Sequence, residues 1–113
     1  MAKYMVLYNS SASASELMAN ATMDEMNSSM EEWKKWAAEA KEKVKFDFGL
    51  PLQVVSKVTP DEVTNSDNQA SGYSTMEGDE ETIVALLKKH PHLNREGASI
   101  DVLEMLPMPG LNT

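Results

Sequence analysis

The chain has 113 residues and a formal net charge of −8, which suits a single domain over residues 1–113 and disfavours nucleic acid as a partner, because phosphate backbones repel an acidic surface. It contains no cysteine, which excludes disulfides, thiolate metal sites and cysteine nucleophiles. The apolar run near the amino terminus is too short for a signal-peptide core or a membrane span, so we expect a cytoplasmic protein without a membrane partner.

The first predicted element is a strand over Lys3–Tyr8, which is apolar on both faces and therefore central in a sheet. The polar stretch after it has room for one helical turn around residues 15–18. Thr22 and Glu25 then match a capping box, which predicts the start of a helix.

The helix after Thr22 carries an apolar stripe with steps of four and three residues, formed by Met26, Met30, Trp33, Ala37, Ala40 and Val44. This stripe predicts that Trp33 is buried. Trp36 lies about 75° away from the centre of the stripe, where it can meet a loop, a ligand or a second subunit.

Gly49 and Pro51 interrupt the helical pattern, and the alternating, valine-rich segment Leu52–Thr59 predicts the second strand. A long polar connection leads to a third strand over Gly72–Met76. Asp79 caps a second helix with Ile83, Val84 and Leu87 on its inner face and Leu86 at the edge, and Pro91 cannot continue it. The last strand is predicted over Ser99–Leu106.

The resulting order β-α-β-β-α-β predicts an α+β fold of the ferredoxin-like type, with two helices on one face of a four-stranded antiparallel sheet. The other sheet face then needs a cover, because the first strand is apolar on both sides. A second copy of the sheet provides it, so we expect a homodimer in the form of a dimeric α/β barrel. The nine methionines are expected mainly to fill this core, with adaptable binding surfaces as the alternative.

Five segments, which follow one another along nearly the whole chain, form a recognisable pattern: "MAKYMVLYN", "MEEWKKWAAEA", "SDNQASGYST", "ALLKKHPHL" and "IDVLEMLPMPG". Together they resemble the YCII-related domain family, near its DGPF branch. The resemblance implies a ferredoxin-like, dimeric α+β barrel with a pocket between sheet and helices. It implies no particular reaction.

The only two histidines, His90 and His92, flank Pro91 at the end of the second predicted helix. His90 lies on the same helix face as Ile83, seven residues earlier. It is either a helix-terminal residue that favours the dipole and caps a carbonyl, or a pocket residue for proton transfer or ligand binding. Metal ligation is a weak third alternative because a lone His-x-His lacks a third ligand, and we predict no metal and no cofactor.

Two functional hypotheses remain open. In the first, the protein is a cofactor-independent enzyme acting on a small organic molecule in the pocket between sheet and helices, with His90 and Tyr73 as catalytic residues and His92, Asp67 and Trp36 as ligand-binding residues. In the second, it is a non-catalytic ligand-binding or structural dimeric module. A His90 within hydrogen-bond reach of an enclosed cavity favours the first hypothesis, and an exposed His90 beside a filled interior favours the second.

Overall fold

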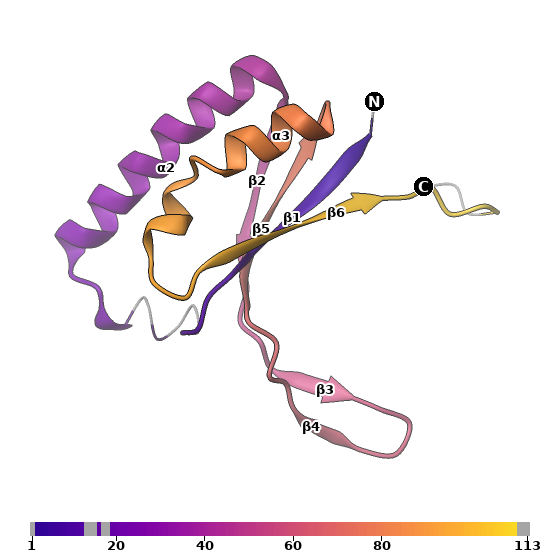
Figure 1. Ribbon diagram of the computed structural model, residues 1–113. Helices are drawn as coiled ribbons and strands as arrows, with labels where there is room; N and C mark the ends of the chain where they lie inside the picture. Colours follow the sequence, from indigo (N-terminus) through magenta and orange to yellow (C-terminus); the bar gives the residue numbers. More distant parts are fainter. Residues whose placement is uncertain (1, 13–15, 17–18, 111–113) are drawn as a thin grey trace.

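The computed structural model describes residues 2–12, 16 and 19–110. It is an α+β structure in which two helices lie on one side of a four-stranded antiparallel sheet (Figure 1), as the sequence predicts. The helices are α2 (Met23–Lys43) and α3 (Glu80–Leu87), and a short 3-10 helix, η1 (Pro91–Asn94), follows α3. The sheet strands, in spatial order, are β2 (Lys45–Pro51), β5 (Ala70–Glu77), β1 (Lys3–Asn9) and β6 (Ser99–Met105).

Local signals place most of these elements correctly. Thr22 is the N-cap of α2 and its hydroxyl accepts a hydrogen bond from the backbone N–H of Glu25 at 3.1 Å. Asp79 caps α3 in the same way through the N–H of Thr82. Of the helical turn predicted at residues 15–18, only Glu16 falls within the described residues.

The second strand is not where the sequence predicts it. Strand β2 starts directly after α2 and ends at Pro51. Gly49 and Pro51, which are predicted to interrupt the structure after the helix, therefore lie within a sheet strand. Glycine and proline are tolerated there because β2 is an edge strand, whose outward N–H groups have no partner in the sheet. The ring and carbonyl of Tyr73 cover Gly49 so closely that no Cβ fits at that position.

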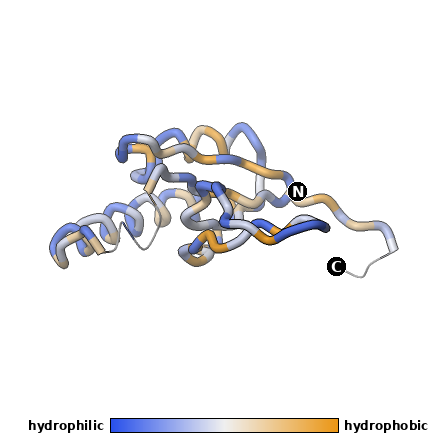
Figure 2. Tube along the Cα trace, turned by 90° about the horizontal axis from the view of Figure 1, so that it is seen from below, coloured by the Kyte–Doolittle hydropathy of each residue, from blue (hydrophilic) through white to orange (hydrophobic). Residues whose placement is uncertain are grey.

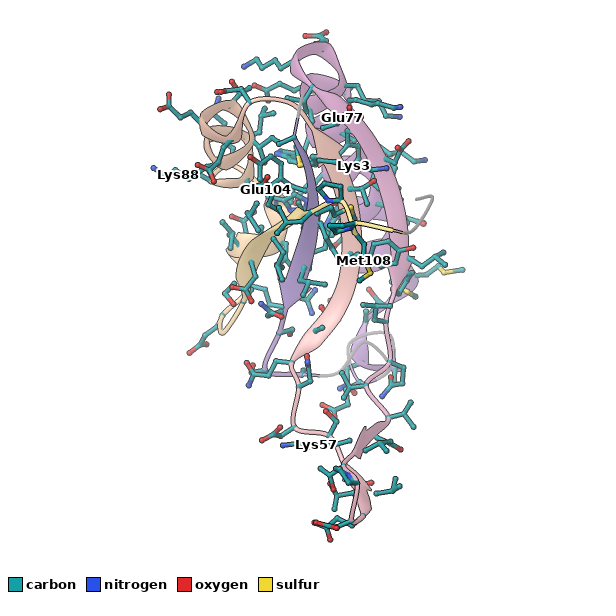
Figure 3. The ribbon with its side chains drawn as sticks, turned by 90° about the vertical axis from the view of Figure 1, so that its right-hand side faces the viewer. Lys3, Lys57, Glu77, Lys88, Glu104 and Met108 are labelled. Carbon is teal, nitrogen blue, oxygen red and sulfur yellow. The ribbon has the colours of Figure 1, made fainter. Side chains whose placement is uncertain are left out.

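The segment predicted as strand Leu52–Thr59 instead leads into a separate arm, residues 52–69, that projects from the sheet (Figure 1). Its strands β3 (Ser56–Val58) and β4 (Val63–Asn65) pair only with each other, and all their residues are exposed. Lys57 marks this arm in Figure 3, well away from Lys3 and Glu77 at the opposite end of the sheet.

The core lies between the helices and one sheet face. Strand alternation turns Tyr4, Val6 and Tyr8 of β1 toward the helices, where the buried set is completed by Trp36, Ala37, Ala40, Val44, Phe46, Met76, Ile83, Leu86 and Leu87. The opposite sheet face, which we call the open face, carries Met5, Leu7, Tyr73, Thr75, Asp101, Leu103 and Met105. In the part of the chain that the structure describes, no helix covers it (Figure 1).

Helix α2 is longer than the sheet beneath it. Its 21 residues span about 31 Å, whereas the seven residues of β1 span about 23 Å. The predicted stripe is therefore buried only in its second half, and Met26 and Met30 are 39% and 58% exposed. The expectation that methionines fill the core is wrong for most of those described, since only Met76 is buried. Beyond β6 the chain leaves the body of the molecule (Figure 2), and Leu106 and Met108 are 75% and 58% exposed there.

Candidate functional site

Helix α3 ends at Leu87, and the chain then turns into η1 with Pro91 at the start of that short helix. His90 is the N-cap of η1: its Nδ1 accepts a hydrogen bond from the backbone N–H of His92 at 2.9 Å. The prediction that the chain stops a helix here is confirmed, but His90 acts as an acceptor at the start of η1 and does not cap a carbonyl of α3.

His90 is 1% exposed and lies in a cluster of aromatic rings. The centroid of its ring is 4.2 Å from that of Trp36, 4.4 Å from that of Trp33 and 4.9 Å from that of Tyr8. Together with His92 these residues form what we call the aromatic cluster. They come from β1, α2 and the turn after α3, so the cluster exists only once the sheet and helices have packed.

The hydrogen bond to Nδ1 fixes the tautomer of His90. A nitrogen that accepts from a backbone N–H carries no proton, so the neutral ring carries its proton on Nε2. This Nε2–H is buried and has no hydrogen-bond partner among the described residues. Burial, and then the neighbouring His92, lower the pKa of His90 to about 3, so the ring is neutral at pH 7.

His92 is also buried, and it ties η1 to the end of β1. Its Nε2 donates a hydrogen bond to the backbone carbonyl of Asn9 at 2.8 Å. Burial lowers the pKa of His92, and the backbones of Asn9 and Ser99 oppose that effect. Both histidine rings therefore hold the turn after α3 in place: His90 accepts a hydrogen bond within the turn, and His92 donates one to β1.

Tyr8 is the residue of the cluster that sequence reasoning missed. Its hydroxyl shares a 2.7 Å hydrogen bond with Ser74 Oγ, and burial raises the pKa of Tyr8 to about 12. The alternation of β1 contains part of the signal, because it places Tyr8 on the same sheet face as Tyr4 and Val6, at the end of the strand. What the alternation does not contain is which helix residues lie opposite.

The structure does not bring Tyr73 and His90 together. Tyr73 alternates with the buried Gly72 and Ser74 and pairs with Leu7, so it lies on the open face, across the sheet from the aromatic cluster. Asp67 is exposed between β4 and β5, outside both regions.

The structure reverses the predicted roles of the two tryptophans. Trp36, expected on the helix flank, is 5% exposed and its Nε1 donates to the Leu86 carbonyl at 2.8 Å. Trp33, expected to be buried, is only partly so. The reason is that α3 packs beside α2 and buries its flank, whereas Trp33 lies where the sheet ends.

Aromatic rings surround His90 between sheet and helices. A hollow of about 400 Å³ that is open to solvent lies elsewhere, between α2 and α3, and is lined by Lys43, Asp79, Glu81, Thr82, Ala85, Leu86 and Lys89. Among the described residues, no three histidine, aspartate or glutamate side chains are placed to hold a metal ion. None of the described helices has the length and apolar character needed to cross a membrane.

Comparisons with known protein families, curated proteins and solved structures found no match to this chain.

Proposed function

We propose that this protein is a non-catalytic, homodimeric module of the YCII-related, ferredoxin-like type, and that it binds a small organic molecule at His90. The strand order β2-β5-β1-β6, in which each helix joins two strands that flank a third, supports a ferredoxin-like arrangement. The five sequence segments support the YCII-related assignment. The absence of cysteine suits a cytoplasmic location.

The observation that carries the binding function is the unpartnered Nε2–H of His90. A buried donor without an acceptor costs roughly 1–3 kcal/mol. A ligand with an acceptor atom recovers this free energy when it binds. An imidazole that only filled space in the aromatic cluster would have no use for this second nitrogen.

The same site is poorly suited to acid–base catalysis. A general base works best with a pKa near the working pH, whereas burial holds the pKa of His90 at about 3. Among the described residues, the His90 ring contacts aromatic rings and one backbone N–H, and no carboxylate or hydroxyl hydrogen-bonds to it. These contacts favour binding over catalysis, with His90 as a neutral donor.

The test is a screen of small neutral molecules against protein labelled with ¹⁵N in its histidines. Binders should shift the Nε2–H resonance of His90, and mass spectrometry after long incubation should find them unchanged. The control is His90→Asn, which keeps an acceptor at the N-cap of η1 but removes the ring donor. Binders that are converted to products, or that bind equally well to the control, would refute this function.

Dimerisation is proposed because the single chain is less compact, and exposes more surface, than a monomer of this size usually does. Its accessible area is 8128 Å², about 2,000 Å² more than a compact monomer of this size exposes. Its radius of gyration is 15.8 Å, against about 13 Å for a compact chain of about 100 residues. The excess area matches what each partner of an obligate dimer buries.

The open face is the surface we propose for the dimer contact, since Met5, Leu7 and Leu103 lie side by side at its centre. The expected result in sedimentation at micromolar concentration is a dimer for the parent protein and a folded monomer for Leu7→Lys. Val84, predicted on the inner face of α3, is 38% exposed in the structure, whereas Leu86 is buried. Val84→Lys is therefore the matched control and should remain dimeric. A folded monomer in the parent protein would refute the proposed dimer.

A further inference from the structure

The two tryptophans beside His90 are held in different ways. Trp36 is buried and its indole N–H is bound to the Leu86 carbonyl, so this ring is locked in place. Trp33 is only partly buried, and its indole N–H has no hydrogen bond to a described residue. Its ring lies 4.4 Å from that of His90, 5.1 Å from that of Tyr8 and 6.4 Å from that of His92. Trp33 is therefore the side of the aromatic cluster that opens at least cost.

An exposed apolar surface adjoins Trp33 on the outer side. Met30 precedes Trp33 by three residues and Met26 precedes Met30 by four, so all three share one face of α2. The two methionines lie on the part of α2 that overhangs the sheet, where nothing between Met23 and Glu32 is buried. Flexible thioether side chains adapt to ligands of varied shape. We call Met26 and Met30 the methionine shelf.

We propose that Trp33 is a movable wall of the His90 site, and that a flat, uncharged aromatic molecule with one hydrogen-bond acceptor takes the place of its indole. The ring of the ligand would lie between Tyr8 and Trp36, and its acceptor would bind Nε2–H of His90. The displaced indole would pack on the methionine shelf. This inference rests on the proposed binding function and adds to it the class of ligand and the route of entry.

Each property of the ligand follows from the residues that would contact it. Rings line the site, so an aromatic ligand restores the edge and face contacts that the indole gives up. The one unsatisfied group is a single N–H donor, so one acceptor such as a carbonyl oxygen suffices. The lining holds no positive charge to pair with a carboxylate, and burying an unpaired anion is costly.

Three probes of similar size test the ligand class by NMR on histidine-labelled protein: acetophenone has a neutral acceptor, ethylbenzene has none, and benzoate has a charged one. Acetophenone should shift the Nε2–H resonance of His90 and bind about tenfold more tightly than ethylbenzene, the effect of one net hydrogen bond. Acetophenone should also bind at least about tenfold more tightly than benzoate. Equal or tighter binding of benzoate or ethylbenzene would overturn the proposed class.

Variants test the wall and the shelf. Trp33→Ala should bind acetophenone more tightly than the parent protein, because no indole must be displaced. Met30→Glu should weaken binding severalfold, whereas Met30→Leu, which keeps an apolar side chain, should weaken it clearly less. Probes that reach His90 in Trp33→Ala but not in the parent protein would refute the movable wall and leave the proposed function standing. Probes that never shift His90, even in Trp33→Ala, would refute both.

Discussion

Acidification should destabilise this protein through His90, because the folded chain keeps neutral an imidazole that the unfolded chain protonates. Burial lowers the pKa of His90 to about 3 in the folded state, against about 6.5 in an unfolded chain. Below pH 6.5 the unfolded state therefore binds a proton that the folded state does not, and the stability falls as the pH falls. Above pH 6.5 this contribution is fully present and constant.

The magnitude follows from 1.36 kcal/mol per pKa unit. Between pH 7.5 and pH 5 the free energy of unfolding should fall by about 2 kcal/mol from His90 alone, and by about 3 kcal/mol at pH 4. Burial also lowers the pKa of His92, so its effect has the same sign. Domains of this size are stable by only about 5–15 kcal/mol, so a loss of this size is readily measured.

The assay is urea unfolding at a series of pH values and one fixed protein concentration, for the parent protein and His90→Asn. Asparagine accepts the hydrogen bond from the N–H of His92 but does not titrate. Its smaller side chain lowers the free energy of unfolding by the same amount at every pH. The variant should lose about 2 kcal/mol less than the parent protein between pH 7.5 and pH 5. Contributions from carboxylates are common to both proteins and cancel. If the free energy of unfolding depends on pH in the same way in both proteins, the proposed role of His90 in acid sensitivity is wrong.

Two further substitutions test the packing. Trp36→Ala should cost roughly 3–5 kcal/mol of unfolding free energy, because it empties a buried site and removes the hydrogen bond from the indole N–H to the Leu86 carbonyl, and Trp33→Ala should cost clearly less; the opposite order in urea unfolding would contradict this placement. Gly49→Ala should cost roughly 1–3 kcal/mol, because the new Cβ would lie 2.5 Å from the ring of Tyr73. Gly72→Ala is the control, since its Cβ would meet nothing nearer than 3.5 Å, and an equal loss of stability in both would refute the explanation.

The sequence predicts those parts of the fold that local chemistry determines. Thr22 and Asp79 mark the starts of both helices because capping depends on residues three positions apart. The alternation in β1 groups Tyr4, Val6 and Tyr8 on one sheet face, but since both faces are apolar it does not predict which of them the helices cover. The strand β2 was missed because Gly49 and Pro51 are breakers in most settings, and only their place at a sheet edge makes them tolerable.

The candidate site is predictable only in part, because most of its contacts depend on tertiary packing. His90 stands out as a rare titratable residue beside a helix end, and the structure places it in the interior. Its neighbours depend on tertiary packing: Trp36 is buried because α3 lies beside α2, and Trp33 is half-buried because the sheet is shorter than the helix. No local pattern contains the relative lengths of two elements, so the sequence reversed the two tryptophans.

The combination of roles at position 90 explains why a histidine stands there. Asparagine or serine could accept the N–H of His92, and phenylalanine could fill the space between Tyr8 and Trp36. Neither kind of residue does both, but an imidazole does both and brings a second nitrogen with it. That nitrogen is an unsatisfied donor among aromatic rings, which weakens the folded state. Burial of the imidazole also makes the folded state sensitive to acid. If packing and capping were the whole role of His90, a planar ring that keeps the N-cap acceptor but lacks Nε2–H should stabilise the protein. If the donor serves a ligand, the same change should abolish binding.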